Sequence, residues 1–133
     1  MIVAHTKVRV RYAETDQMGI VYHGVYLTWF EVGRIILLDE IGLPYRELEN
    51  AGYRLPVLEA NLKYLKPAYF DDIIKIETLI KNRPSARIKI EYHLFRKDEL
   101  ICSGYTGHAF ITDKGRATRP PLTFVEKTSH HFN

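Results

Sequence analysis

The first residues of the chain alternate between apolar and polar side chains. Within residues 3–12, one set of alternate positions holds Val8, Val10 and Tyr12, and the other holds Lys7, Arg9 and Arg11. A period of two is the pattern of a β-strand with one buried face. Strand-like runs recur later, with short turn sequences between them, over residues 54–66, 73–81, 86–95 and 100–112. The sequence therefore predicts a sheet whose successive strands are antiparallel, because short turns join them.

After the first strand the period changes to that of a helix. Residues 25–41 are apolar around most of the helical circumference, which is typical of a helix buried on nearly all sides. Gly42 and Pro44 mark its end, and residues 44–51 favour a second, shorter helix.

One long helix followed by antiparallel strands indicates an α+β fold in which the sheet curls around the helix. The last segments are short: a strand at 116–120, one helical turn from Thr123 and a frayed end at 130–133. A sheet that wraps a single helix keeps an outer face and open edges, and both favour self-association. We therefore expect an oligomer.

Length and charge narrow the class of protein. The 133 residues suit one domain, residues 1–133. The net charge is +3 and the basic residues are dispersed, which argues against a nucleic-acid binder. No apolar run approaches the roughly 18 residues of a membrane span, and the first residues lack the features of a secretion signal. The single cysteine, Cys102, excludes an intramolecular disulfide framework and favours a reducing cytoplasm.

The segment from Tyr12 to Arg34 holds the residues best suited to chemistry. A polar cluster contains Glu14 and Asp16, and a turn bracketed by glycines then leads through His23 to the predicted start of the helix. Unpaired N–H groups and the helix dipole make a helix N-terminus positive. A carboxylate held beside such an N-terminus is an arrangement that catalysis can use. In this interpretation the segment is the active site and the rest of the chain is its scaffold.

Three stretches carry a resemblance to a known family: residues 12–23, residues 26–34, and Leu65-Lys66-Pro67-Ala68 followed by Asp71-Asp72. They resemble hotdog-fold acyl-CoA thioesterases, in particular the 4-hydroxybenzoyl-CoA thioesterase type and its small bacterial relatives associated with the Tol–Pal gene cluster. The resemblance implies a hotdog fold, in which a curved antiparallel sheet of five to six strands wraps one long central helix. It also implies an acyl-CoA substrate and a homodimer, usually paired into a homotetramer, with each active site at a subunit interface.

The resemblance assigns the catalytic carboxylate to Asp16, which acts either as general base on water or as nucleophile on the thioester carbonyl. The N–H groups near His23 and Gly24 would form the oxyanion hole, and Gly24 would let the substrate approach the backbone. From the residues alone, Asp16 also suits an Asx turn that holds the loop. His23 either assists proton transfer and orientation or only holds its turn, and Tyr22 is expected at the pocket mouth.

Two positions depart from common family forms. Glu14 stands where aspartate is frequent, and Gly24 stands where a larger polar or small residue often lies. Neither change removes the catalytic carboxylate.

Glu31 is a reserve carboxylate on the predicted helix, although pairing with Arg34 on the same helix face is the simpler interpretation. His108 lies in an alternating strand and fits a structural role, and the histidines have no metal-ligand spacing. No cofactor is expected, because coenzyme A is part of the substrate. The possible partners of its phosphates are Lys66, Arg83, Arg87 and Arg116.

Two other functions remain open on this fold. A hotdog hydratase or dehydratase would use an Asp–His pair to move water across a C–C double bond. A non-catalytic acyl-thioester-binding protein would keep the pocket but would have little reason to hold Asp16 at the helix start.

Overall fold

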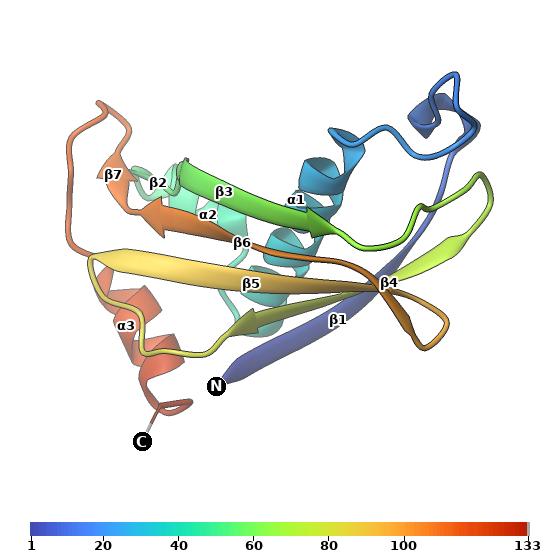
Figure 1. The fold of residues 1–133 in the computed structure, drawn as a ribbon. Helices are drawn as coiled ribbons and strands as arrows, with labels where there is room; N and C mark the ends of the chain where they lie inside the picture. Colours follow the sequence, from blue (N-terminus) through green and yellow to red (C-terminus); the bar gives the residue numbers. More distant parts are fainter. Residues whose placement is uncertain (133) are drawn as a thin grey trace.

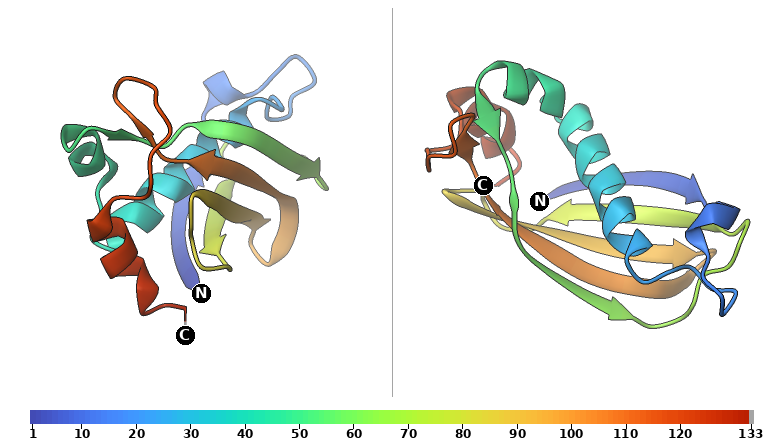
Figure 2. Two further views of the ribbon diagram at one scale, coloured as in Figure 1. Left: turned by 90° about the vertical axis from the view of Figure 1, so that its left-hand side faces the viewer. Right: turned by 90° about the horizontal axis from the view of Figure 1, so that it is seen from above.

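A computed structural model describes residues 1–132 of the chain. Five strands form one antiparallel sheet in the order β1-β4-β5-β6-β3. The long helix α1 lies along one face of this curved sheet (Figure 1, Figure 2). The strands are β1 (Ile2–Arg9), β3 (Val57–Tyr64), β4 (Ile73–Ile80), β5 (Arg87–Arg96) and β6 (Glu99–Ala109). The helices are α1 (Val25–Glu40), α2 (Tyr45–Asn50) and α3 (Leu122–Ser129). The predicted α+β hotdog arrangement is confirmed.

Two predicted strands are each divided in two. The run over residues 54–66 is interrupted at Pro56, which has no N–H for a strand ladder, so that β2 (Tyr53–Arg54) separates from β3. The run over residues 100–112 breaks between β6 and β7 (Ile111–Thr112). β2 and β7 pair with each other in a small second sheet. The chain therefore lies outside the main sheet just before β3 and just after β6, and these two short segments pair with each other.

The C-terminal region is more helical than the sequence predicts. The single turn expected from Thr123 is the eight-residue helix α3, whose Phe124 is buried with its ring edge against Phe110. The strand expected at 116–120 is reduced to an isolated bridge between Ala117 and β7. An aromatic contact that closes the end of the core stabilises α3, and local sequence does not reveal this contact.

The end of the chain is held against its beginning. The carbonyl oxygen of His131 accepts a hydrogen bond from the N-terminal ammonium, and that of Phe132 accepts one from the guanidinium of Arg83. The prediction of a frayed end at 130–133 is therefore wrong for residues 130–132, and Asn133 lies outside the described residues.

Helix α1 buries one face rather than its whole circumference. Its large buried side chains recur every three or four residues and are Tyr26, Trp29, Phe30, Leu37 and Leu38. On the opposite side Leu27 is 42% exposed, and Glu31 is exposed as well. The prediction of a helix wrapped on nearly all sides is wrong for the single chain, in which one side of α1 faces solvent.

Two glycines set how closely α1 lies on the sheet. A Cβ atom on Gly33 of α1 would lie 2.3 Å from Oγ1 of Thr78 and 2.8 Å from a methyl group of Ile76, both on β4. A Cβ atom on Gly104 of β6 would lie 2.1 Å from a backbone oxygen of β3 and 3.0 Å from the ring of Phe30. Any larger residue at either position would push the helix or a strand aside, because a packed core does not absorb such overlap.

A directed chain of hydrogen bonds runs through the core beside α1. Nδ1 of His108 lies 3.1 Å from the carbonyl oxygen of Pro56 and must donate to it, so Nε2 accepts from Oγ1 of Thr106 at 2.7 Å. The Thr106 oxygen then accepts from the hydroxyl of Tyr92 at 2.6 Å, and the Tyr92 oxygen accepts from Arg34 at 3.2 Å. Every member has a partner, and the predicted structural role of His108 follows from its place in this chain.

This chain predicts how stability depends on pH. Burial and the charge of Arg34 lower the pKa of His108 to about 4 from its ordinary value of 6.5. Below pH 6.5, His108 therefore binds a proton in the unfolded chain, whereas in the folded protein it binds one only near pH 4. Stability falls over this window, by about 2 kcal/mol between pH 7.5 and pH 5. The variant His108→Gln keeps one donor and one acceptor but does not titrate. We expect its free energy of unfolding to fall by about 2 kcal/mol less than that of the wild type over the same pH range. Urea unfolding of both proteins at each pH measures the difference, and equal losses would contradict the prediction.

Candidate active site

Asp16 lies in a tight turn that follows β1. The chain leaves β1 at Arg9, three residues before the end of the predicted strand, and makes a single 3-10 turn over residues 12–14. The N–H of Asp16 then donates to the carbonyl of Ile20 at 2.9 Å, and Gly19 adopts a φ of 79° to close the turn. Oδ1 of Asp16 accepts the N–H of Met18 at 2.8 Å. The Asx turn considered for Asp16 is therefore present and uses one carboxylate oxygen.

Glu14 fastens this segment to helix α1. Its carboxylate is nearly buried, with one oxygen accepting the N–H of Arg11 at 2.7 Å and the other accepting Nε1 of Trp29 at 3.3 Å. Its carbonyl oxygen accepts the N–H of Tyr22 at 2.9 Å. The position that departs from the family's frequent aspartate thus ties both ends of the segment to the helix. This role cannot be predicted from local sequence, because the Trp29 contact depends on how α1 packs.

Asp16 and His23 line the same cleft, which has a volume of about 440 Å³. The other lining residues come from the Asp16 turn, the start of α1, the end of β3 and the loop after it. They are Met18, Ile20, Val21, Tyr26, Tyr64, Leu65, Lys66 and Pro67. Most of these side chains are apolar or aromatic, so the cleft can hold an apolar group close to a carboxylate.

The cleft ends at the start of α1. The N–H of Val25 donates to the carbonyl of Tyr22 at 3.0 Å. Within residues 1–132, neither the N–H of His23 nor that of Gly24 makes a hydrogen bond. Two unpaired donors at a helix N-terminus form a positive site for a developing oxyanion.

Tyr22 and Gly24 do not line the cleft, although they lie next to it. Tyr22 is 49% exposed, and its ring is tilted against His23 with 4.3 Å between centroids. A Cβ atom on Gly24 would lie 2.9 Å from the Tyr22 ring. Gly24 therefore makes room for the Tyr22 side chain, and any approach of a substrate would be to its N–H group.

Glu31 lies away from Asp16, on a second cavity of about 380 Å³ that α1 forms with residues 55–57. The expected ion pair between Glu31 and Arg34 is absent within the described residues, because the guanidinium of Arg34 turns inward to Tyr92. The structure thus separates the reserve carboxylate from the cleft of its own chain.

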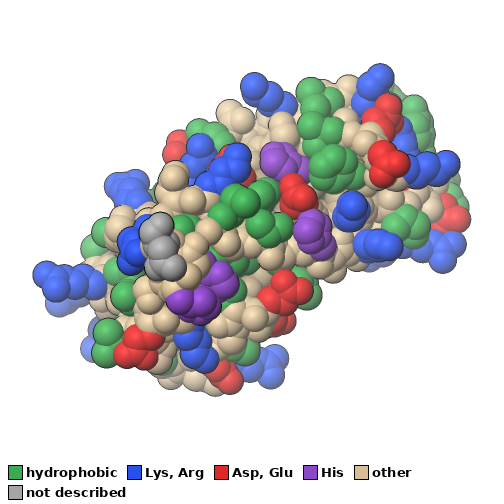
Figure 3. Space-filling model, turned by 90° about the horizontal axis from the view of Figure 1, so that it is seen from below, with side chains coloured by type: hydrophobic (Ala, Val, Ile, Leu, Met, Phe, Trp, Pro, Cys, Tyr) green, Lys and Arg blue, Asp and Glu red, His purple; other side chains and the backbone are tan. Residues whose placement is uncertain are grey.

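Only one of the four basic residues considered for the coenzyme A phosphates lines the cleft, and it is Lys66. Arg83 and Arg87 line a separate cavity of about 320 Å³, and Arg116 is exposed just after a turn. Figure 3 shows the basic side chains of one face scattered among acidic ones. The dispersed charge inferred from the sequence is thus visible on the surface.

His5 and His93 have no partner in the sequence but share one in the fold. Both lie on the side of the sheet away from the core and contact Glu77, His93 at 2.9 Å and His5 at 3.1 Å. The hydrogen bond from His93, with that from His5, lowers the pKa of Glu77. Among residues 1–132, no three His, Cys, Asp or Glu side chains are placed to hold a metal ion.

Two tyrosines that line the cleft, Tyr26 and Tyr64, were not predicted from the sequence as site residues. The hydroxyl of Tyr64 donates to the carbonyl of His23 at 2.9 Å, and its ring meets that of Tyr26 edge-on, with 5.1 Å between centroids. Burial raises the pKa of Tyr26 to about 12, so its hydroxyl stays protonated at neutral pH. Tyr64 directly precedes the Leu-Lys-Pro-Ala stretch, and this adjacency is the only signal that could have found it.

The described part of the chain contains no helix with both the length and the apolar character needed to cross a bilayer.

Cys102 is buried, with its pKa raised to about 12 by desolvation. A thiol in this state is not a nucleophile, and Cys102 does not line the cleft.

Comparison with known proteins identifies the family of the chain. Residues 10–128 match the family model described as the thioesterase-like superfamily. The YneP protein of Bacillus subtilis is 40% identical over 112 residues, which cover 84% of this chain and 81% of YneP. The acyl-CoA thioesterase YbgC of Haemophilus influenzae is 31% identical over 129 residues, covering 94% of this chain and 93% of YbgC.

A solved structure extends the comparison to three dimensions. The DHNA-CoA thioesterase of Staphylococcus aureus superimposes with a TM-score of 0.91 at 32% identity, covering 98% of this chain and 91% of that chain. The resemblance to hotdog thioesterases is confirmed by these matches, whereas the Tol–Pal-associated branch stays a prediction. The chain belongs to the thioesterase-like superfamily.

Proposed function

We propose that the protein hydrolyses acyl-CoA thioesters in the cleft that holds Asp16 and His23. The observation that carries the proposal is a carboxylate beside an apolar cleft that ends at unpaired N–H groups of a helix start. A thioester needs little more than this, because its carbonyl is already activated and its sulfur leaves readily. Relatives named as acyl-CoA and DHNA-CoA thioesterases support the choice of substrate class.

In the proposed reaction, the thioester carbonyl oxygen points at the N–H groups of His23 and Gly24. Oδ1 of Asp16 is engaged with Met18, so Oδ2 is the oxygen that acts. As general base, Oδ2 takes a proton from water while the water oxygen bonds to the carbonyl carbon. The C–S bond then breaks and the thiolate leaves as coenzyme A, taking up a proton.

A nucleophilic role for Asp16 fits the same geometry. Oδ2 would attack the carbonyl carbon and expel the thiolate, and water would hydrolyse the resulting mixed anhydride. In both routes His23 is suited to pass a proton to the departing sulfur, because it lines the cleft together with Asp16.

One observation favours a second candidate, a non-catalytic acyl-thioester-binding protein. The hydrogen bond from Met18 gives Asp16 a complete structural role in its turn, and a binder would need no more than that. Catalysis tests the two candidates against each other.

We expect Asp16→Asn to keep the turn, because its side-chain oxygen still accepts the Met18 N–H, but to lose catalysis. Thiol release from acyl-CoAs from acetyl to palmitoyl and from benzoyl-CoA should fall at least about 100-fold in kcat. The melting temperature should change little. Asp98→Asn, an exposed aspartate in the turn between β5 and β6, is the matched control. Absence of thiol release from the wild type would support the binder instead. Full activity in Asp16→Asn would contradict the catalytic role of Asp16.

We also propose that the active protein is a homodimer, paired further into a homotetramer. β3 is the edge strand of the sheet beside the cleft, and nearly all of its residues are exposed. Val57 and Leu58 at its start are 46% and 49% exposed. Antiparallel pairing of two β3 edges would join the sheets and cover these apolar side chains. It would also bring a partner subunit to the open cleft.

Ala60 tests this arrangement. It is exposed near the middle of β3, so in an antiparallel pair it would lie close to the two-fold axis and to its own copy. We expect Ala60→Glu to place two like charges there and to shift the protein towards the monomer. Light scattering after size-exclusion chromatography measures the change. Ala86→Glu, at an exposed alanine in a turn, should leave the oligomer intact. A monomeric wild type, or equal behaviour of the two variants, would contradict the proposal.

A further inference from the structure

The loop between β3 and β4, residues 65–72, forms one wall of the cleft. Leu65, Lys66 and Pro67 line the cleft directly. The loop contains neither helix nor strand, so no regular ladder of backbone hydrogen bonds fixes its shape. Its geometry must come from individual contacts.

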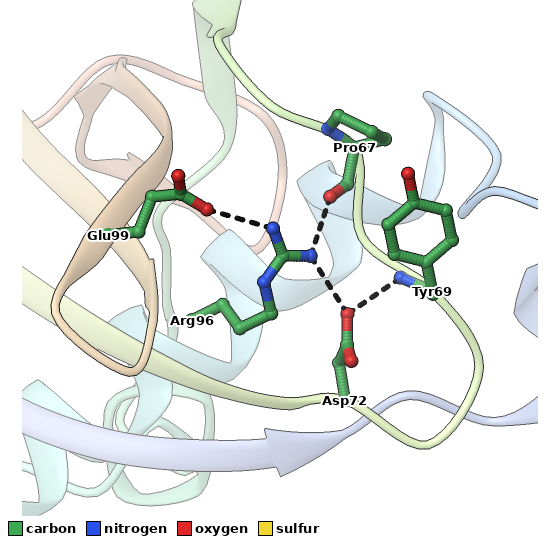
Figure 4. Close-up of polar contacts among 5 residues, drawn as sticks. All are labelled: Pro67, Tyr69, Asp72, Arg96 and Glu99. Atoms are coloured by element: carbon green, nitrogen blue, oxygen red, sulfur yellow. Dashed lines mark hydrogen bonds and ion pairs between the residues drawn. The ribbon is translucent and has the colours of Figure 1, made fainter.

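Arg96, the last residue of β5, closes this loop on itself. Its Nη1 donates to the carbonyl oxygen of Pro67 at 2.8 Å and to Oδ2 of Asp72 at 3.0 Å. Figure 4 shows the guanidinium between these two acceptors, with Glu99 on its other side. The same Asp72 oxygen also accepts the N–H of Tyr69 at 2.9 Å. One half-buried side chain thus holds the cleft-lining half of the loop against its far end.

The loop is in turn fastened to the segment that holds Asp16 and His23. Ala68 is fully buried, and its carbonyl oxygen accepts the N–H of Val21 at 2.8 Å. Val21 also lines the cleft and lies two residues before His23. A shift of Pro67 would therefore move Ala68, the next residue, and through its bond to Val21 it would also move the wall that holds Asp16 and His23.

We propose that Arg96 is a positioning residue for the cleft, because it fixes the loop whose residues form the cleft wall and bond to the Asp16 segment. Arg96 does not line the cleft, so it acts through Pro67 and Asp72 and never touches the substrate. The kinetic part of the proposal rests on the proposed thioesterase function, whereas the ordering of the loop does not.

An arginine is suited to this task because its guanidinium is a rigid planar fork with several donors. It reaches a carbonyl, a carboxylate on the loop and a second carboxylate on β6 at the same time. A lysine ammonium is a single point and cannot keep all three contacts. Arg96→Lys should therefore fall between the wild type and Arg96→Gln.

Glu99 provides the control that separates positioning from simple stabilisation. Its carboxylate accepts Nη2 of Arg96 at 2.9 Å, the same kind of contact as Asp72 makes. Glu99 belongs to the hairpin of β5 and β6 and not to the loop. Glu99→Gln weakens the ion pair but leaves the bonds to Pro67 and Asp72 in place.

The experiment compares Arg96→Gln, Asp72→Asn and Glu99→Gln with the wild type in kcat, KM and hydrogen–deuterium exchange. We expect kcat/KM for an acyl-CoA to fall about tenfold in the first two variants, and less than about twofold in Glu99→Gln. Exchange should accelerate in residues 65–72 and at the N–H of Val21 in the same two variants. The double variant Arg96→Gln/Asp72→Asn should be little worse than either single one, because both weaken the same ion pair between Arg96 and Asp72.

Equal falls in melting temperature with unchanged kcat/KM in all three variants would overturn the proposal, since Arg96 would then only stabilise the fold. If Arg96→Gln fails to fold, Arg96→Lys carries the same comparison. A wild type without thiol release would count against the proposed function alone. Exchange then decides for Arg96: unchanged protection of residues 65–72 overturns the proposal, and faster exchange supports it.

Discussion

The close seating of α1 on the sheet is the constraint on which the rest of the structure depends. Gly33 and Gly104 leave no room for a side chain between helix and strands, so the helix axis has one position. Phe30 then stacks on Tyr92 with 4.1 Å between nearly parallel rings. Because the helix cannot slide along the sheet, its N-terminus has a fixed position relative to the strands. The cleft forms around this N-terminus.

From this point the site is assembled by side-chain and main-chain hydrogen bonds together. Glu14 joins the Asp16 segment to Trp29 on α1, and Ala68 joins the opposite wall to Val21. The Asp16 carboxylate keeps its place because its own turn is closed by backbone bonds. The site therefore depends strongly on side chains outside the cleft, such as Glu14 and Arg96.

The sequence predicted the parts of the fold that local periodicity determines. The α1 helix, the strand pattern and the Asp16 turn follow from spacing and turn chemistry within a few residues. Pairing between distant residues could not be predicted, because it depends on strand register. The Tyr64 bond to His23 joins residues 41 apart, and Arg34 turned to Tyr92, 58 residues away, rather than to Glu31. Local rules favour the nearest partner, whereas the fold offered Arg34 a buried one.

The exposed side of α1, which the sequence predicted to be buried, connects the fold to the proposed assembly. An apolar circumference predicted burial on nearly all sides, and a single chain leaves Leu27 in solvent. The sheet can cover only one side of a helix, so the other side needs a second molecule if its apolar residues are selected for burial. The proposed partner at β3 lies next to the open cleft, and Glu31 faces a cavity beside the start of that strand. The proposed dimer thus accounts with one interface for two separate features: the exposed Leu27 on the outer side of α1 and the exposed edge strand β3.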